Sequence, residues 1–516
     1  MERNPLFDDR GSKRFVLIVL PVLVLMFYAT SSMHFAYTPD DTYIYLQFAK
    51  NIIHGNGMSF NAGEPTYGFT SPLWVFIISL GGAVGVDVYI AAKTIDLVFA
   101  SLTIVVFYFL SLEVIRENIL ALLSTLAFSL HVWLLRWAGS GMETSLSVLL
   151  VVTAMLFCLR NEYLISAVMA ALLTLVRPEA CLLLGLIAID VLINTIDKKF
   201  ALKMIARMTA VFALIVAPWL VYAFYTFGTV IPNTALAKSS LGFGLADVGH
   251  ELLNVMKIVM ASDGLSVLAL LVGGIFLFRQ FQNERSADNE ERFFLIRQSL
   301  VGILWIVSIP LLYCMLHVHV VSRYLLVITP LITVFGFTYL FRTLNKSRYS
   351  RFSYAGVVVF TGLLLIQSQT VYYRVVKPGI NAFAEGMEST LIPIGDWLKK
   401  NSAPGDVAMA WDIGAVGYYS NRKICDAAGL VTPEMISLAH ATTFHQIIEE
   451  RLYKSYCDVR YIVHRSDQPV EFKDTPGVSP IFTRPFYRLG IMRMDTLYYT
   501  LYKVDNDTSK SHLGSE

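Results

Sequence analysis

Charged residues are scarce in this chain. Of its 516 residues only 16% are charged and 55% are hydrophobic, and the mean hydropathy is +0.57. A soluble domain usually has about 25% charged residues, so the composition excludes an ordinary soluble globular protein. Apolar runs of roughly 20 residues, the length that crosses a bilayer, recur along the sequence. We therefore predict that most of the chain lies in a lipid bilayer.

Net charge and cysteine content are equally low. The formal net charge of +2 argues against nucleic-acid binding. The five cysteines show no metal-type spacing, and Cys158, Cys181 and Cys314 fall in apolar segments, where small buried hydrophobic residues are expected. Cys425 and Cys457 follow the last apolar segment. They could pair if that region lies outside the cytoplasm, but the sequence does not establish that they are close.

The apolar segments predict an all-α polytopic membrane domain over residues 1–371. The first run, 15–33, follows basic residues and is long for a signal peptide, so we expect a retained helix with a cytoplasmic N-terminus. Basic stretches at 198–203, 279–297 and 342–351 mark further cytoplasmic loops. The other apolar segments are 71–87, 90–112, 118–135, 144–160, 163–176, 178–194, 204–226, 264–278, 298–316, 322–341 and 354–371.

Segment 71–87 leaves two topologies open. If it spans the membrane, Arg116 and Arg160 lie outside; if it lies along the surface, both are cytoplasmic. We prefer the second topology, which gives about 11 transmembrane helices and an extracytoplasmic C-terminus, in a bacterial inner membrane. Residues 34–89 then form an external loop with interfacial helices. Segment 163–176 is short for a span and needs tilt or local thinning of the bilayer.

Residues 372–516 predict a small soluble α/β domain outside the cytoplasm. Apolar strands at 407–411 and 423–426 flank a turn that leads into a helix. Gly414 and Gly417 do not complete the glycine spacing of a dinucleotide site.

Two adjacent carboxylates, Asp40 and Asp41, follow the first predicted span. Asp40 could cap a helix over about 42–53, with Tyr43, Leu46 and Ile53 facing lipid and Gln47 and Lys50 facing water. One carboxylate would suffice for that role, and a second would repel it. The pair therefore predicts either a divalent cation site or a base with an orienting partner. The metal requirement stays open, and no cofactor is required.

Further acidic groups lie near predicted helix ends. Glu143 precedes an apolar helix, where it could favour the helix dipole or serve as a second acidic group. Arg177 and Glu179 are costly at membrane depth unless they are paired or used. They could form a mutual ion pair, or Arg177 could hold a lipid-linked phosphate bidentately.

Two more external segments carry basic groups. Asn233 and Lys238 could contact sugar or phosphate, or simply be solvated. His319 and Arg323 are four residues apart and would share a helix face if the helix starts early. We interpret that pair as a basic patch that meets phosphate rather than as a metal site.

Eight short motifs occur in a fixed order: Asp40–Tyr43, Gly55–Asn61, Gly68–Trp74, Gly141–Thr144, Arg177–Glu179, Pro232–Lys238, Ser322–Tyr324 and Gly414–Tyr419. Together they resemble the GT-C glycosyltransferase superfamily, and most closely the mycobacterial-type terminal β-(1→2) arabinofuranosyltransferases and their bacterial relatives. The resemblance covers residues 15 to about 430. Two positions depart from the family pattern: Asn56 stands where His is frequent, and Ala180 where Gly is frequent.

The resemblance implies a membrane glycosyltransferase of EC class 2.4. It would transfer a sugar, with inversion, from a polyprenyl-phosphate donor to a glycan, lipid or protein acceptor on the outer face. It implies Asp40 as general base, with Asp41 beside it and Glu143 as a further acid. The donor phosphate would be bound by Arg177, Lys238, His319 and Arg323, and substrate would be positioned by His54, Asn61, Glu179 and Asn233. The alternatives are a transporter or lipid-linked-glycan flippase, or a non-catalytic relative in envelope assembly.

Overall fold

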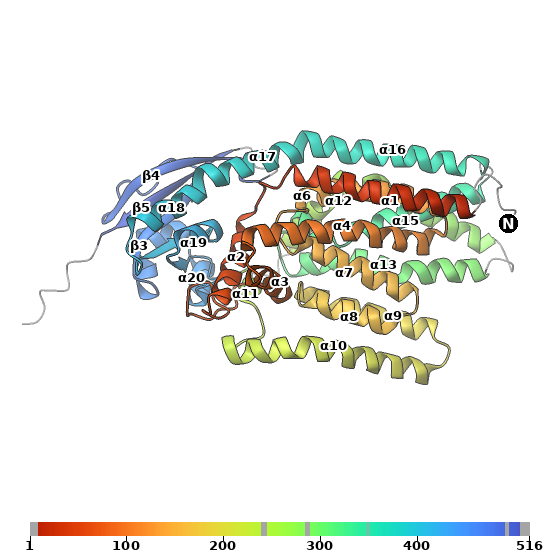
Figure 1. Cartoon of the computed structure of the whole chain (residues 1–516), viewed down its shortest axis with the longest axis horizontal. Coiled ribbons are helices and arrows are strands. Elements are labelled where there is room, and N and C mark those ends of the chain that lie inside the picture. Colours follow the sequence, from red (N-terminus) through yellow and green to blue (C-terminus); the bar gives the residue numbers. More distant parts are fainter. Residues whose placement is uncertain (1–8, 239–244, 284–288, 348–349, 491–494, 506–516) are drawn as a thin grey trace, which may run out of the picture. The chain divides into compact units, whose positions relative to one another are not determined.

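The computed structural model describes residues 9–238, 245–283, 289–347, 350–490 and 495–505. The chain forms two compact units (Figure 1). The helical unit comprises Met1–Phe35, Lys93–Leu220 and Leu241–Val376. The mixed unit comprises Ala36–Ala92, Val221–Ser240 and Lys377–Glu516. Residues 34–89, predicted as a loop of the membrane domain, therefore fold largely with the C-terminal region.

The helical unit consists of helices only, as far as the chain is described. They are α1 (Asp9–Ser32), most of α4 (Val88–Ile115) and α10 (Lys198–Phe227), α5 (Asn118–Ser129), α6 (Val132–Trp137), α7 (Thr144–Leu159), α8 (Tyr163–Thr174), η1 (Pro178–Cys181), α9 (Leu182–Asn194), α12 (Leu245–Asn283), α13 (Asn289–Met315), α14 (Ser322–Leu325), α15 (Thr329–Lys346), η2 (Ser350–Phe352), α16 (Ser353–Val371) and η3 (Tyr372–Val376).

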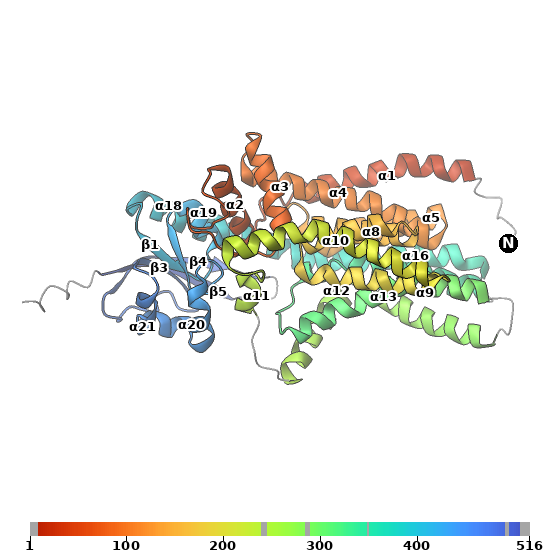
Figure 2. The same cartoon turned by 90° about the horizontal axis from the view of Figure 1, so that it is seen from below.

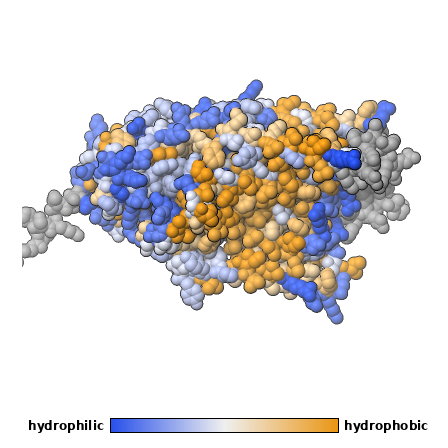
Figure 3. Space-filling view, in the orientation of Figure 1, coloured by the Kyte–Doolittle hydropathy of each residue, from blue (hydrophilic) through white to orange (hydrophobic). Residues whose placement is uncertain are grey.

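The outward faces of these helices are apolar. On α1, Val16, Leu20 and Phe27 are buried at one-face spacing, whereas Leu17 and Leu25 are exposed. Figure 3 shows apolar side chains gathered over the long helices and hydrophilic ones over the C-terminal sheet. A helix that is apolar all round needs an apolar solvent, so the exposed face is one that a bilayer covers.

Six helices in the described part of the chain are long and apolar enough to cross a membrane. They lie within Arg14–Ser32, Val88–Ile115, Lys198–Phe227, Asp247–Gln280, Arg297–Met315 and Ser350–Asn401. Shorter apolar helices include α8 and α3 (Pro72–Ala83), each of 12 residues. Such a helix rises only about 18 Å, less than the roughly 30 Å hydrocarbon core. The helical membrane fold is thus confirmed, and the count of about 11 spans stays a prediction.

The mixed unit contains a five-stranded sheet in the order β2-β1-β3-β5-β4. Strands β1 (Val407–Ala410), β2 (Lys423–Asp426) and β3 (Val459–Ser466) run parallel, and β4 (Val478–Tyr487) and β5 (Thr496–Val504) are antiparallel. In Figure 2 helices α18 (Ile392–Asn401) and α19 (Gly414–Ser420) lie on one face of the sheet, and α20 (Ile436–Ala441) and α21 (Phe444–Glu449) on the other. The predicted small C-terminal α/β fold is confirmed. The remaining elements of the unit are α2 (Asp40–Ile53), α3, α11 (Asn233–Lys238), α17 (Lys377–Gly386), η4 (Met387–Leu391), η5 (Pro433–Met435) and η6 (Leu452–Ser455).

Helix α2 corrects two expectations. Its predicted lipid-facing residues, Tyr43 and Leu46, are 2% and 0% exposed, because Tyr43 packs against Tyr418 and Tyr419 of α19. Gln47 was expected to face water, but it is buried and donates to the Phe60 carbonyl at 3.1 Å. The helix is a core element of the mixed unit rather than an amphipathic surface helix.

The cysteines behave as expected with one exception. Cys425, on β2, and Cys457, just before β3, form a disulfide with Cα atoms 6.2 Å apart. The pairing that the sequence left open is therefore present. Cys158 and Cys314 are buried as predicted. Cys181, the last residue of the 3-10 turn η1, is exposed, contrary to the prediction.

Candidate functional site

The carboxylate of Asp40 is held by the main chain of α19. Its Oδ2 accepts from Gly414 N and its Oδ1 from Ala415 N, each at 2.8 Å. The helix that Asp40 begins, α2, shows no side-chain cap hydrogen bond. The predicted capping role is therefore corrected: Asp40 satisfies the N-terminal amides of a helix some 374 residues further along the sequence.

Burial and charge both act on Asp40. Burial, with a further contribution from the negative charge of Asp412, raises the pKa of Asp40 to about 7, against the opposing effect of the two amide hydrogen bonds. Asp41 also raises the pKa through its charge, as the smallest contribution. A carboxyl group with a pKa near neutrality matches the requirement for a general base at physiological pH.

Asp412 links Asp40 to two residues of the sheet. Its carboxylate oxygens accept from Arg465 Nη1 at 3.2 and 2.8 Å, and Oδ2 also accepts from the Tyr499 hydroxyl at 2.7 Å. Arg465 and Tyr499 are cross-strand partners on β3 and β5. Burial acts to lower the pKa of Arg465, but Asp412, and to a lesser extent Tyr499 and Asp40, outweigh it and raise that pKa. We call Asp40, Asp412, Arg465 and Tyr499 the acidic network.

The acidic network lies where the sheet changes its winding direction. Strand β1 has β2 on one side and β3 on the other. Asp412 follows β1, and Arg465 lies at the carboxyl end of β3. In open α/β sheets, ligands bind outside the carboxyl ends of the strands at such a switch point. The topology therefore places these groups where a ligand site is expected.

Gly414 is required for the approach of Asp40. A Cβ at this position would collide with the Asp40 main-chain oxygen and lie 2.8 Å from its Oδ2. We expect Gly414→Ala to destabilise the mixed unit by about 1–3 kcal/mol, the usual cost of overpacking, and to reduce activity. Urea unfolding followed by a probe in this unit measures the change. Gly405→Ala is the matched control, because nothing lies within 4 Å of its added Cβ; equal effects of the two substitutions would contradict this role.

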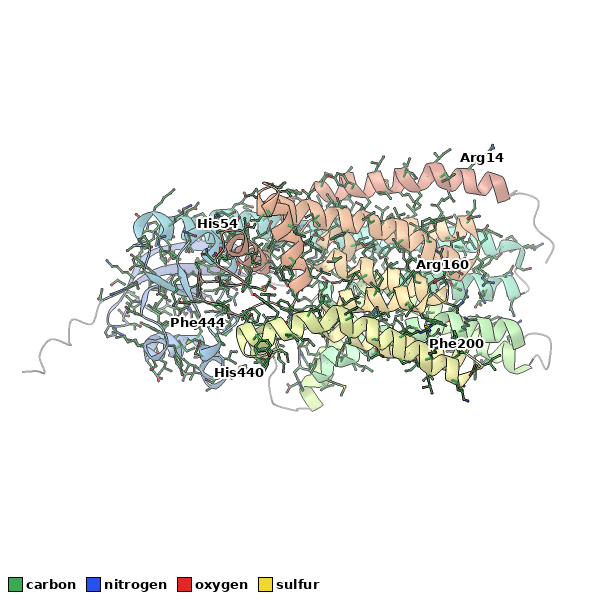
Figure 4. The ribbon with its side chains drawn as sticks, turned by 60° about the horizontal axis from the view of Figure 1, so that its bottom comes forward. Arg14, His54, Arg160, Phe200, His440 and Phe444 are labelled. Atoms are coloured by element: carbon green, nitrogen blue, oxygen red, sulfur yellow. A yellow bond between two sulfur atoms is a disulfide. The ribbon has the colours of Figure 1, made fainter. Side chains whose placement is uncertain are left out.

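Three predicted substrate-positioning residues lie in the mixed unit. Asn61 pairs with the β2 main chain, donating to Ile424 O at 3.0 Å and accepting from Ile424 N at 2.9 Å. The Asn233 amide donates to Leu430 O at 3.1 Å and is buried. His54 ends α2 and is exposed (Figure 4), with Nδ1 2.7 Å from Lys50 O. The contacts of Asn61 and Asn233 join distant segments of this unit.

Helices of the other unit gather a second set of predicted residues. Glu143 does not cap α7 with its side chain but accepts from Arg177 Nη2 at 2.9 Å. Glu179 lies 3.6 Å from Arg177 Nη1, so the expected Arg177–Glu179 pair is the longer of two. Tyr313 donates to Glu179 and accepts from Arg177 Nη1 at 3.5 Å. The Arg177 and Glu143 side chains are only 6% and 5% exposed.

Aromatic rings extend this cluster to Arg323. Tyr324 is 5.2 Å from both the Arg177 and the Arg323 guanidinium carbons, measured to its ring centroid. Trp137 also faces Arg323 and donates from Nε1 to Ser322 Oγ at 3.0 Å. Glu143, Arg177, Glu179, Tyr313 and Arg323, with these rings, form what we call the guanidinium cluster. Both guanidinium groups are buried and lie against aromatic faces.

Two predicted phosphate ligands lie outside the cluster. His319 precedes α14, which begins only at Ser322, so it does not share a helix face with Arg323 as expected. Its ring lies 3.1 Å from Glu251 and is 74% exposed. The side chain of Lys238 lies outside the described residues. Within the described part of the chain, no group of three or more His, Cys, Asp or Glu could hold a metal ion.

Sequence reasoning missed Asp412, Arg465, Tyr499 and Tyr313. Asp412 carried a usable signal, since it directly follows a predicted strand that leads into a glycine turn. The other three lie in apolar or alternating stretches and become visible only through strand pairing and helix packing.

Residues 381–504 match a family model described as "Domain of unknown function (DUF8728)". Among curated protein sequences, none matches the chain significantly.

Solved structures resemble the chain over most of its length. ArnT from Cupriavidus metallidurans in the apo state shares 12% identity at a TM-score of 0.57, over 92% of this chain and 97% of ArnT. The archaeal oligosaccharyltransferase AglB from Archaeoglobus fulgidus, in complex with an inhibitory peptide and a dolichol-phosphate, shares 14% at 0.53, over 87% of this chain and 69% of AglB. The fold is of the GT-C type.

The predicted GT-C architecture is confirmed as a fold, and the six long apolar helices indicate a multi-pass membrane protein. ArnT bound to undecaprenyl phosphate is a further match, with 12% identity and a TM-score of 0.54, over 94% of this chain and 97% of ArnT. The closer resemblance to arabinofuranosyltransferases stays a prediction.

Proposed function

We propose that this chain is a glycosyltransferase that moves a sugar from a polyprenyl-phosphate donor to a glycan, lipid or protein acceptor. The observation that carries the proposal is the Asp40 carboxylate, held by Gly414 N and Ala415 N at the switch point of a sheet in a GT-C fold. AglB in complex with a dolichol-phosphate and ArnT bound to undecaprenyl phosphate support the donor class.

In the proposed reaction Asp40 accepts the proton of an acceptor hydroxyl. The hydroxyl oxygen attacks the anomeric carbon, and the bond from that carbon to the phosphate oxygen breaks with inversion. The electron pair leaves with the lipid phosphate, whose charge grows in the transition state. We assign Arg177 and Arg323 to that phosphate, since charge-assisted guanidinium hydrogen bonds stabilise it. Glu143 orients Arg177.

The C-terminal domain is proposed to lie outside the cytoplasm of a bacterial inner membrane. The Cys425–Cys457 disulfide supports this side, because disulfides persist in oxidising compartments. The cytoplasmic placement of the N-terminus rests on the basic residues before α1.

The acidic network predicts a pH dependence of transfer. Asp40 acts as a base only when ionised, so the rate should rise with pH through about 7. Asp412→Asn removes a negative charge that raises the pKa of Asp40. The acidic limb of the pH–rate profile, over which the rate rises, should therefore move to lower pH. Arg465→Gln removes a positive charge that interacts with Asp40 and favours its ionised form. The acidic limb should therefore move to higher pH. Initial transfer rates between pH 5 and 9, measured for each variant, test both signs.

The control for this pH series is Asp458→Asn, which removes one carboxylate whose side chain is 87% exposed. Its acidic limb should coincide with that of the unmodified chain. Shifts of Asp412→Asn and Arg465→Gln in the same direction would contradict the charge account of the acidic network.

A deletion strain tests the proposed function in the cell. Its envelope glycans and lipids should lack one sugar, and the polyprenyl-phosphate form of that sugar should accumulate. Complementation by the unmodified chain should restore the profile, whereas Asp40→Asn should not. An unchanged profile in the deletion strain would contradict the proposed function.

A further inference from the structure

The helical unit contains a polar cavity far from the guanidinium cluster. The cavity measures about 330 Å³ and is lined by Glu113, Arg116, Arg160, Asn161, Asp190 and Arg297, among others. Helix α7 carries Glu143 at its start and Arg160 just after its end. Its 16 residues rise roughly 24 Å, so the cavity and the guanidinium cluster lie at opposite ends of the same helix.

Positive charge dominates the cavity lining. Arg116, Arg160 and Arg297 outnumber the two carboxylates, Glu113 and Asp190. Arg160 Nε lies 3.3 Å from Glu113 Oε2, yet its side chain stays 42% exposed. Arg297 donates to the neutral amide of Asn161. The lining thus keeps a net positive charge, with guanidinium groups whose geometry suits phosphate.

Another arginine lies behind the wall of the cavity. Gln298 lines it and accepts from Arg342 Nη2 at 3.4 Å, while its own Nε2 donates to Glu113 O at 3.0 Å. The cavity wall is therefore tied together by hydrogen bonds between α13, α15 and the end of α4. A cavity with such fixed walls is organised before its ligand arrives.

An apolar surface adjoins the cavity. On α9, which contributes Asp190, the neighbouring Ile189, Leu192 and Ile193 are exposed. On α8, which begins beside Asn161, Leu164 and Ile165 are exposed as well. In a membrane protein this surface faces acyl chains. A molecule with a phosphate head and apolar tails matches the cavity and the surface together.

We propose that this cavity binds the anionic headgroup of a membrane phospholipid, with its tails along α8 and α9. A volume of about 330 Å³ accommodates a headgroup but not a whole lipid. Basic pockets between transmembrane helices are a recognised binding mode for anionic headgroups. The chemistry that the cavity recognises is a phosphate ester, which free phosphate partly shares. This site is separate from the proposed transfer reaction and does not depend on it.

Native mass spectrometry of the purified full chain tests the proposal. The chain is titrated with phosphatidylglycerol and with phosphatidylcholine, and bound lipids are counted. We expect phosphatidylglycerol to bind at least about tenfold more tightly, and Arg160→Gln/Arg297→Gln to remove that preference. Arg160→Lys/Arg297→Lys, which keeps the charges, should retain part of it and shows whether the folded chain is intact.

Arg14→Gln is the matched control. It removes one positive charge at the start of α1, toward the same end of the helical unit as Arg160 (Figure 4), and should leave the preference unchanged. A third titration uses inorganic phosphate alone, which should neither compete with phosphatidylglycerol nor raise the melting temperature. Equal binding of the two lipids, an undiminished preference in the double glutamine variant, or full competition by inorganic phosphate would each overturn the lipid site.

Discussion

Asp40→Asn is expected to reduce sugar transfer by roughly 10²–10⁴-fold, the usual contribution of a general base. The asparagine keeps one carbonyl oxygen that can accept from the α19 main chain, but its amide group cannot take up the acceptor proton. Initial rates of transfer by the full chain in lipid nanodiscs measure the loss. Transfer at the unmodified rate would contradict the assignment of Asp40 as base.

Asp41→Asn separates the roles of the two carboxylates. Asp41 raises the pKa of Asp40 by its charge, so its removal should shift the acidic limb of the pH profile to lower pH. The maximal rate should fall less than in Asp40→Asn. A larger loss in Asp41→Asn, with an unshifted limb, would reverse the two roles. Urea unfolding of both variants shows whether the contact between Asp40 and α19 matters for stability rather than for the reaction.

Arg177→Gln is expected to destabilise the helical unit by roughly 3–5 kcal/mol, because it leaves a buried charge without its partner. Glu143 is 5% exposed, and its Oε1 accepts from Arg177 at 2.9 Å. Its other oxygen, Oε2, has no hydrogen-bond partner among the described residues. Thermal unfolding of the purified chain in detergent measures the effect.

The double variant Glu143→Gln/Arg177→Gln tests the mechanism of that loss. The second substitution removes the buried Glu143 charge that Arg177→Gln leaves without its partner, so the double variant should be more stable than Arg177→Gln alone. Arg160→Gln is the matched control, since its pair with Glu113 is 42% and 30% exposed and should contribute only about 0–1 kcal/mol. Additive losses in the double variant would contradict a coupled buried pair.

Much of the fold could be predicted from the sequence because lipid imposes strong local patterns. The apolar runs located the helices, and the predicted strands at 407–411 and 423–426 correspond to β1 and β2. Glu143, Arg177, Glu179 and Arg323 were singled out because charge is rare near apolar helices. The structure brings these four into one cluster.

Other features depend on contacts between distant segments. Helix α2 has the pattern of a surface helix, and its burial follows from contacts with α19, more than 360 residues later. The pairing of Arg465 with Asp412 depends on the parallel alignment of β1 and β3. Asp40 could therefore be singled out as a candidate base from its acidic neighbour, but its contacts with α19 and the nearby charge of Asp412 could not be foreseen.

The most direct test of the central claim is sugar transfer by the purified chain in nanodiscs. It is supplied with a panel of sugars carried on a polyprenyl phosphate, with the same sugars on nucleotides, and with an envelope glycan extract as acceptor. The account predicts that one lipid-linked sugar is consumed, with product of inverted anomeric configuration and free polyprenyl phosphate in equal amounts, and that Asp40→Asn prevents this. Movement of the lipid-linked sugar across the bilayer without any glycosylated product would contradict it and favour a flippase.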